Sequence, residues 1–463
     1  MNESRFPDGF LWGAATSAYQ IEGAPLADGA GPSIWHRFSH IPGNIARDET
    51  GDTACDHYNR YRGDVALMAE LGLQTYRFSI SWSRVLPAGR GAVNRAGLDF
   101  YSRLVDELLG HGIQPNVTLY HWDLPAALDD AGGWTHRDAA GWFADYAEIV
   151  ARRIGDRVGL WTTLNEPWVI VDAGYLHGVH APGRSSASEA VHAAHNLLRA
   201  HGAGVQALRT HVDGRIGIAI NLEPKVPASD RPADAEATRR ADAYMNRFYL
   251  DALLRSSYPA ELEGIFGDAW PEVPAGDMAL IAQPLDFVGI NFYKRGVTRH
   301  DPAAWPVYAS LAPQPQNPFT ALGPDWEVYP PAFTDVLLWF RDRYGDMPVY
   351  VTENGAAFED PAPAADGSVD DAERVGYLRR HLRALHAAIR AGVDVRGYYV
   401  WSLLDNFEWS AGYAPRFGIV GVDYRTFERT PKRSARFYAE VIATHGAAAL
   451  SEAHSEDVRR DPG

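Results

Sequence analysis

Short apolar runs recur along most of this 463-residue chain, and each is bounded by glycine, proline or polar residues. Residues 349–352, for example, are Val, Tyr, Val and Thr, and Gly355 ends the run shortly afterwards. Such runs of β-branched and aromatic residues are typical of buried strands. The pattern predicts strands at residues 10–19, 75–80, 116–120, 160–164, 215–220, 286–290, 349–352 and 396–403.

Between the predicted strands lie longer segments in which apolar residues recur with helical spacing. In residues 95–112, for example, Leu98, Tyr101 and Leu108 fall on one face of a helix. The same periodicity predicts helices at residues 57–72, 95–112, 138–154, 189–211, 235–256, 332–344, 371–392 and 434–445.

The alternation of strands with helices predicts an α/β fold, a single (β/α)8 TIM barrel with long active-site loops. The structural alternative is an open, doubly wound sheet, but no glycine-rich phosphate fingerprint follows the first strand. We expect residues 1–446 to form one catalytic barrel, with the helix at 434–445 covering its bottom. The proline-dense segment 301–331 is expected to be an irregular loop, and residues 447–463 a flexible tail.

Composition and charge exclude several classes of partner. The net charge of −16 disfavours nucleic acid. The chain has no apolar run long enough to cross a bilayer, and residues 1–9 do not resemble a signal peptide. With Cys55 as its single cysteine, we expect a cytoplasmic protein without membrane partners, and the sequence does not indicate its oligomeric state. The 14 Trp and 22 Tyr are notable, because aromatic faces pack against the C–H faces of sugars.

Two glutamates stand where predicted strands end. Glu353 follows the run at 349–352, and Glu166 follows the run at 160–164 and precedes Pro167, which cannot continue a strand ladder. In a barrel, the carboxyl ends of all strands meet at one rim. Cleavage of a glycosidic bond needs one ionised carboxylate and one carboxylic acid on either side of that bond. Either glutamate alone is also compatible with a residue that merely caps a loop.

Seven motifs resemble those of the retaining β-glycosidases of glycoside hydrolase family 1, the β-glucosidase family. Each motif is weak alone, but together they follow the family's order across nearly the whole chain. The resemblance implies a (β/α)8 barrel, which agrees with the predicted strands. The motifs are FLWGAATSAYQIEG (10–23), YRFSISW (76–82), HWD (121–123), TLNEP (163–167), NFY (291–293), TENG (352–355) and WSLLDNFEW (401–409).

The resemblance implies that Glu353 is the nucleophile and Glu166 the acid/base. In a retaining enzyme the two carboxyls lie about 5–5.5 Å apart. We expect Arg77 to keep Glu353 ionised, and the resulting negative charge to raise the pKa of Glu166. Once Glu353 is esterified to the sugar, the pKa of Glu166 should fall, so that it can act as a base.

The resemblance also implies the residues that bind the non-reducing sugar; no pattern could be transferred for the leaving-group side, so the aglycone preference stays open. Asn165 would reach the 2-hydroxyl, and Trp401 would lie beneath the sugar ring. Glu408 would repel a phosphate, so we expect unphosphorylated substrates. The catalytic support residues are Arg77, Asn165, Asn291 and Tyr293; the glycone residues are Gln20, His121, Trp122, Asn165, Trp401, Glu408, Trp409 and Phe417; the aglycone residues are Trp168 and Trp326, with Tyr175, His177 and Phe417 as further candidates.

These residues predict a β-glucosidase acting on small β-glycosides or short β-linked oligosaccharides, including β-galactosides and β-fucosides. The alternatives are a transglycosidase that uses the same intermediate and a non-catalytic carbohydrate-binding barrel. We expect no cofactor and no metal. The pairs His177/His180 and His192/His195 have a spacing of three residues, but neither is accompanied by a cysteine or by an acidic ligand in a recognised motif.

Overall fold

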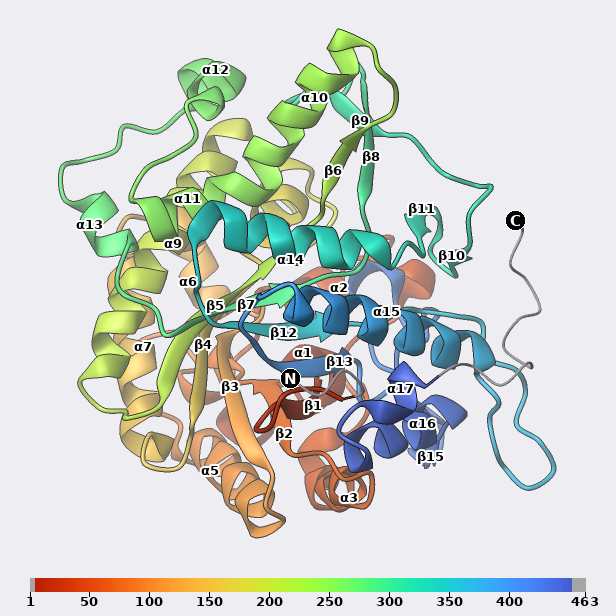
Figure 1. Ribbon diagram of the computed structural model, residues 1–463. Coiled ribbons are helices and arrows are strands. Elements are labelled where there is room, and N and C mark those ends of the chain that lie inside the picture. Colours follow the sequence, from red (N-terminus) through yellow and green to blue (C-terminus); the bar gives the residue numbers. More distant parts are fainter. Residues whose placement is uncertain (1–4, 452–463) are drawn as a thin grey trace.

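Parallel strands close into a barrel at the centre of the molecule (Figure 1). The computed structural model describes residues 5–451 of the chain. Around the barrel the strand order is β1, β13, β12, β7, β5, β4, β3 and β2, which is the order of the chain apart from strands inserted in loops. The barrel strands are β1 (Leu11–Ala15), β2 (Thr75–Ser79), β3 (Gln114–Tyr120), β4 (Leu160–Asn165), β5 (Arg215–Asn221), β7 (Phe287–Asn291), β12 (Val349–Asn354) and β13 (Val395–Trp401).

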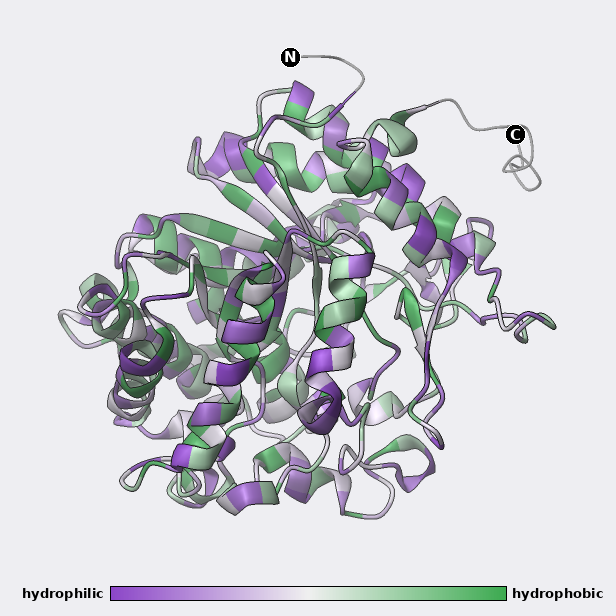
Figure 2. Ribbon diagram, turned by 90° about the horizontal axis from the view of Figure 1, so that it is seen from below, coloured by the Kyte–Doolittle hydropathy of each residue, from purple (hydrophilic) through white to green (hydrophobic). Residues whose placement is uncertain are grey.

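Helices surround the barrel, and hydrophobic and hydrophilic residues alternate along them (Figure 2), the apolar ones being largely buried. In α5, the residues Leu98, Tyr101 and Leu108 that predicted a helix are all buried. The predicted helix at 235–256 is divided by a π-helical turn at 243–247. The outer helices are α3 (His57–Glu70), α5 (Arg95–Gly110), α7 (Ala139–Ile154), α9 (Ala187–Arg209), α10 (Pro232–Asp242), α11 (Phe248–Arg255), α14 (Pro331–Tyr344), α15 (Ala372–Arg390) and α16 (Arg433–Ala443).

The loops that follow the barrel strands carry short elements of their own. Segment 301–331, expected to be irregular, contains three short strands, two of which form an antiparallel pair. Strands of two to five residues are too short to leave a clear period in a proline-rich sequence. The loop elements are α1 (Ala18–Ile21), α2 (Ile34–Ser39), α4 (Trp82–Val85), α6 (Ala126–Asp130), α8 (Pro167–Val171), α12 (Glu261–Phe266), α13 (Asp277–Ile281), β6 (Lys225–Pro227), β8 (Gly296–His300), β9 (Ala309–Leu311), β10 (Phe319–Thr320), β11 (Gly323–Glu327), β14 (Val420–Val422) and β15 (Arg429–Pro431).

The predicted first strand, 10–19, was too long. Strand β1 ends at Ala15, and a helical turn, α1, begins at Ala18. The backbone N–H of Ala18 donates to Ser79 Oγ at the end of β2, which turns the chain across the rim. Ala18, Tyr19 and Ile21 are buried in the rim loops rather than in the barrel. A buried turn and a buried strand have the same apolar composition, so the sequence did not separate them.

Two predictions about the C-terminal region were also wrong. Helix α16 does not cover the barrel bottom; it packs beside α15, and Tyr438 on it donates to the backbone oxygen of Gly13 in β1. Residues 447–451 do not belong to a tail, because Ala447–Leu450 form a short helix, α17, in which Ala449 is buried. Residues 452–463 of the predicted tail lie outside the described residues.

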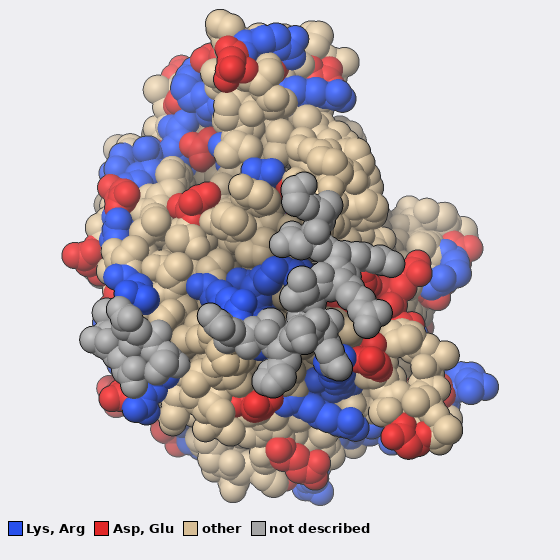
Figure 3. All heavy atoms as spheres, turned by 45° about the vertical axis from the view of Figure 1, so that its right-hand side comes forward, with Lys and Arg blue, Asp and Glu red and all other residues tan. Residues whose placement is uncertain are grey.

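Each end of the barrel holds a hollow. At the N-terminal ends of the strands, the bottom hollow has a volume of about 1260 Å³ and is lined by residues that include Gln114, Arg215 and Arg396. At the opposite rim, the rim hollow has a volume of about 900 Å³. On the face in Figure 3, basic and acidic side chains are interspersed. Within residues 5–451, no helix has both the length and the apolar character needed to span a membrane.

Candidate active site

Both candidate glutamates line the rim hollow. Glu353 belongs to β12, where it pairs with Asn291 at the end of β7, and its backbone oxygen accepts from Phe292 N at 2.9 Å. Glu166 follows β4 directly and donates its N–H to Ala219 O of β5, also at 2.9 Å. The two carboxyls are therefore delivered to the same cavity by strand ends on either side of β5 and β7.

The backbone changes direction at Glu166. This residue has φ 49°, in the left-handed region, and Pro167 begins helix α8 immediately after it. A left-handed glutamate is strained, because its Cβ approaches the following carbonyl oxygen. Such strain is maintained where the surrounding structure fixes the residue, and here the N–H bond to Ala219 and the start of α8 fix it from both sides.

Glu353 is held by a cation and a hydroxyl. Arg77 Nη1 donates to Glu353 Oε1 at 2.6 Å, and Tyr293 OH donates to Glu353 Oε2 at 2.5 Å. The side chain of Arg77 is 0% exposed and that of Glu353 is 3% exposed. Burial is the largest effect and leaves the pKa of Glu353 raised, although Arg77 and the Tyr293 hydroxyl both act to lower it. Both oxygens of Glu353 thus have donors that favour its ionised form.

Glu166 lacks such a cation. Its Oε1 accepts a hydrogen bond from Asn291 Nδ2 at 2.8 Å, and within the described part of the chain it forms no ion pair. Burial, and then the negative charge of Glu353, raise the pKa of Glu166 to about 8. Glu166 therefore holds its proton at neutral pH, while Arg77 favours the anion on Glu353. Such a pair presents one acid and one anion to the same ligand.

A network of buried hydrogen bonds fixes both carboxyls. Asn165 Oδ1 accepts from Arg77 Nη2 at 2.6 Å and from Asn291 Nδ2 at 3.0 Å. Thr352 Oγ1 donates to Asn291 Oδ1 at 2.6 Å, which orients the amide that reaches Glu166. Because every amide atom has a defined partner, the side chains are held in one arrangement before any ligand arrives.

His121 has a free donor in this cavity. Its Nε2 lies 3.1 Å from Asn165 Nδ2. An amide nitrogen only donates, so Nε2 accepts and the proton of the neutral ring lies on Nδ1. Burial, and then the charge of Arg77, hold the pKa of His121 well below its usual value. His121 Nδ1 is buried without a hydrogen-bond partner, so it can donate to a ligand hydroxyl.

Aromatic rings form the walls around this polar group. Trp401, the last residue of β13, stacks on His121 with ring centroids 5.9 Å apart, and Trp122 lies 4.6 Å from Trp409. Beside Trp409, burial and the charge of Glu353 raise the pKa of Glu408 to about 8. The side chain of Gln20 lies behind Glu408, where Nε2 donates to Asn406 Oδ1 at 2.9 Å and to Phe407 O at 3.0 Å.

Most of the predicted site residues line the cavity directly, and three stand behind it. Gln20, Arg77 and Asn165 are fully buried and contact the lining residues. The predicted residues that line the cavity are His121, Trp122, Glu166, Trp168, His177, Asn291, Tyr293, Trp326, Glu353, Trp401, Glu408, Trp409 and Phe417.

Tyr175 does not belong to this lining, contrary to the prediction. It is fully buried, and its hydroxyl accepts from Trp134 N at 3.4 Å on the far side of the loop after β4. The ring of Phe417 lies 6.2 Å from that of Tyr293, a predicted support residue, and 6.5 Å from that of Trp326, a predicted aglycone residue.

Sequence reasoning missed a charged group on the outer side of the cavity. Glu223, Lys225 and Lys294 all line it. Lys225 forms an ion pair with Glu223 Oε1, and Lys294 Nζ lies 3.6 Å from Glu223 Oε2 and 5.6 Å from the ring centroid of Trp326. The signal was the scarcity of lysine: two of only three lysines follow barrel strands β5 and β7 closely.

Comparison with known proteins gives one consistent result. The family model described as "Glycosyl hydrolase family 1" matches residues 2–447. The chain is 48% identical to beta-glucosidase A of Thermotoga maritima, over 96% of this chain and 99% of that protein. It is 44% identical to a bifunctional beta-D-glucosidase/beta-D-fucosidase of Bifidobacterium breve, over 96% and 99% of the two chains. The solved structure of the family 1 β-glucosidase from Thermotoga maritima superposes with a TM-score of 0.93 at 48% identity, and the match covers 96% of this chain and 99% of that chain.

Proposed function

The chain belongs to glycosyl hydrolase family 1, and we propose that it is a retaining β-glucosidase acting by double displacement. Its substrates are β-glycosides and short β-linked oligosaccharides with a terminal, non-reducing, unphosphorylated β-D-glucosyl residue. Glu353 is the nucleophile and Glu166 the acid/base. The observation that carries this proposal is the unequal surroundings of two carboxyls in one cavity: a cation contacts Glu353, whereas Glu166 has no such partner and its pKa is raised to about 8.

In the first step, an oxygen of Glu353 attacks the anomeric carbon of the sugar. The bond from that carbon to the glycosidic oxygen breaks, and Glu166 gives its proton to the departing oxygen. The alcohol or sugar on the leaving-group side then departs, and the glucosyl group remains as an ester of Glu353. Arg77 and Tyr293 hold the attacking carboxylate, so little reorganisation precedes the attack.

In the second step, the charges have changed. Esterified Glu353 carries no negative charge, so the interaction that raised the pKa of Glu166 is lost. Glu166, now a carboxylate, removes a proton from water, and the oxygen of that water attacks the anomeric carbon. The ester bond breaks, the carboxylate of Glu353 is restored beside Arg77, and glucose leaves with its original β-configuration.

The glycone is bound by the groups around the two carboxyls. The ring of Trp401 supports the sugar face, while the free Nδ1–H of His121 donates to a hydroxyl. Glu408, whose pKa is about 8, is mostly protonated at neutral pH, so direct repulsion by Glu408 is not what excludes phosphate. Instead, no described cation forms an ion pair with Glu408, and a phosphate there would lie close to the carboxylate of Glu353.

We extend the proposal to β-galactosides and β-fucosides. A relative that is 44% identical is named as a bifunctional glucosidase/fucosidase. A Thermotoga maritima β-glucosidase at 47% identity has been solved with a galacto-configured hydroximolactam. A panel of nitrophenyl β-glycosides tests the extension, and fucoside turnover more than a thousandfold below glucoside turnover contradicts it.

Replacement of Glu353 tests the proposed chemistry. Glu353→Ala should lower kcat/KM for an aryl β-glucoside by about 10⁴-fold or more, because the nucleophile is gone. Azide is small enough to occupy the vacated space, and it should restore turnover and yield the α-glucosyl azide. The matched control is Glu359→Ala, which removes an exposed glutamate from the following loop and should keep wild-type activity. A folded Glu353→Ala variant that stays inert in azide, or gives the β-azide, contradicts the assignment.

A further inference from the structure

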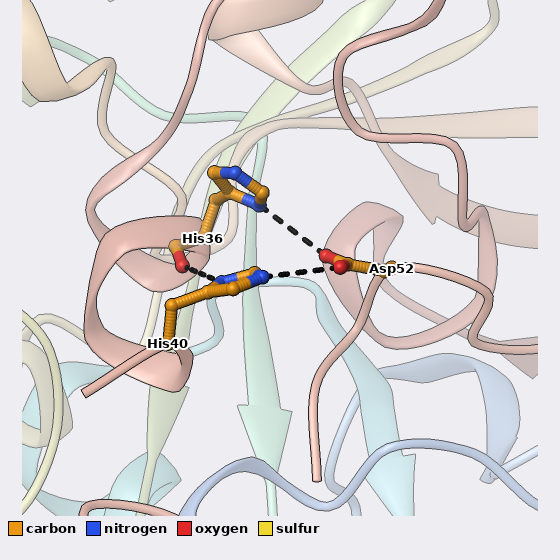
Figure 4. A group of neighbouring side chains, drawn as sticks. All are labelled: His36, His40 and Asp52. Atoms are coloured by element: carbon orange, nitrogen blue, oxygen red, sulfur yellow. Dashed lines mark hydrogen bonds and ion pairs between the residues drawn. The ribbon is translucent and has the colours of Figure 1, made fainter. Parts of the chain in front are cut away.

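A second cluster of ligating side chains lies outside the catalytic cavity. His36 on α2, His40 just after this helix, and Asp52 in the loop before α3 turn their side chains toward one another (Figure 4). One ligand atom from each lies within 4.8 Å of the others. His36 and His40 are four residues apart, so both rings project from the same side of the helix.

The contacts have the spacing of a coordination sphere. His36 Nδ1 lies 3.3 Å from Asp52 Oδ1, and His40 Nε2 lies 3.1 Å from Asp52 Oδ2. Ligand atoms about 2.1 Å from a tetrahedral ion are separated from each other by about 3.4 Å. His36 Nδ1 and Asp52 Oδ1 are both buried, and neither has a hydrogen-bond partner, although they face each other. An ion between them would satisfy both atoms.

The outer contact of His40 prepares its ring for coordination. His40 Nδ1 lies 2.6 Å from the backbone oxygen of His36, which only accepts, so this nitrogen carries the proton. In the neutral ring, the lone pair of Nε2 then points at Asp52. Metal-bound histidines commonly donate their second N–H to a carbonyl in this way.

We propose that His36, His40 and Asp52 bind one divalent transition-metal ion of the zinc class. Two imidazoles and one carboxylate suit Zn²⁺, Co²⁺ or Ni²⁺ rather than Mg²⁺ or Ca²⁺, which prefer oxygen ligands. His40 is 44% and Asp52 is 42% exposed, so the ion can enter from solvent and keep one position for water.

The bound ion connects α2 to the loop that precedes α3, and both support the wall of the catalytic cavity. Trp35, next to His36, packs 4.5 Å from the ring of Trp409. On the loop, Glu49 Oε2 accepts from Tyr413 N at 2.6 Å, and Thr50 O accepts from Tyr413 OH at 2.7 Å. The ion therefore stabilises the segments that hold residues 409–413 in place.

Binding of the metal alone provides the test. The full-length enzyme is first treated with a chelator and dialysed. Binding of ZnCl₂ is then measured by equilibrium dialysis, and binding of CoCl₂ is followed by visible absorption. We expect one tightly bound ion per chain, the visible band of four-coordinate Co²⁺, and a higher Tm with Zn²⁺. Absence of the band, together with unchanged Tm in excess Zn²⁺, overturns the proposal and leaves a simple ion pair between His40 and Asp52.

Variants locate the ion. Asp52→Asn and His40→Gln should each weaken Zn²⁺ binding at least tenfold and abolish the rise in Tm. Both side chains are partly exposed, so the apo variants should fold, which circular dichroism checks. His192→Gln, at an exposed histidine on α9, is the matched control and should bind as the wild type does. If the Asp52 and His40 variants retain wild-type affinity, the ion binds elsewhere and the assignment is wrong.

Discussion

Each end of the barrel has a hollow, but the charged side chains beside the two hollows differ in how deeply they are buried. The bottom hollow is the larger, at about 1260 Å³ against about 900 Å³ at the rim. At the bottom, Arg396 and Asp394 form an ion pair at 2.8 Å, with both side chains about 40% exposed. At the rim, Arg77 and Glu353 form an ion pair at 2.6 Å, with exposures of 0% and 3%.

The difference in burial decides what each pair can do. An exposed pair is screened by water and contributes about 0–1 kcal/mol to stability. A buried pair has lost its hydration, and its pKa values respond strongly to every neighbouring charge. The pKa of Glu166 rises to about 8 for this reason. Cavity volume therefore does not identify the site, whereas buried, unequally compensated carboxyls do.

Of the variants that test this contrast between the two ends, Glu166→Ala should have the largest effect. Loss of the proton donor should lower kcat/KM for alkyl glucosides by about 10²–10⁴-fold, because their leaving groups need protonation. For dinitrophenyl glucoside, whose leaving group departs as an anion without a proton, kcat/KM should fall far less. If kcat/KM falls equally for both substrates, Glu166 is not the acid.

The pH profile gives a control for this prediction. The pKa of Glu166 is about 8, so the acid is present below that pH and is lost as the pH rises through it. Wild-type kcat/KM on alkyl glucosides should therefore fall above about pH 8, and this limb should be missing in Glu166→Gln. The raised pKa also means that the folded state disfavours ionised Glu166, so Glu166→Gln should unfold at a higher temperature than the wild type at pH 8.

An intermediate effect is expected from Arg77→Met. Without the cation the pKa of Glu353 rises further, so its ionised fraction falls and the acid limb of kcat/KM moves to higher pH. We expect kcat to fall by about 10²–10³-fold. Removal of one partner from a buried ion pair should also reduce the free energy of unfolding by about 3–5 kcal/mol, with the loss growing as the pH rises and Glu353 ionises. An unchanged acid limb in this variant would contradict the role of Arg77.

The smallest effect is expected from Arg396→Met, the matched substitution at the opposite end of the same barrel. Its ion pair with Asp394 is exposed, so the free energy of unfolding should change by about 0.5 kcal/mol or less. Activity should stay within about twofold of the wild type, since the residue lies far from the rim. Urea unfolding measures the free energy, and aryl glucoside turnover measures the activity. A loss of either as large as that in Arg77→Met would contradict the distinction between the two ends of the barrel.

The barrel could be predicted from sequence because its signals are local. Each buried strand is a short apolar run, and residues such as Asn165, Asn291 and Trp401 stand at or beside strand ends, so the fold places them at one rim. The predicted α/β barrel and the family resemblance are confirmed. The roles of Glu166 and Glu353 remain predictions, supported by their placement in one cavity.

The features that the sequence did not predict depend on contacts between distant segments, and the spacing of apolar residues carries no information about such contacts. Tyr175 resembles an aglycone residue by position, but it packs against Trp134 and Arg184 instead. The end of β1 depends on a hydrogen bond from Ala18 to Ser79, 61 residues away. Similarly, Lys294 reaches the cavity because Glu223, from the loop after β5, and Trp326, on β11, lie beside it. Such pairings are determined by the three-dimensional arrangement of the loops.

The central claim is that Glu353, held ionised by Arg77, forms a covalent bond to the sugar. The most direct measurement is mass spectrometry of the enzyme after incubation with a 2-deoxy-2-fluoro-β-glucoside that carries an activated leaving group, followed by peptide mapping. The account predicts one fluoroglucosyl group per chain, on the peptide that contains Glu353, and its slow release in buffer. Inactivation without any adduct, or an adduct on another residue, would contradict it.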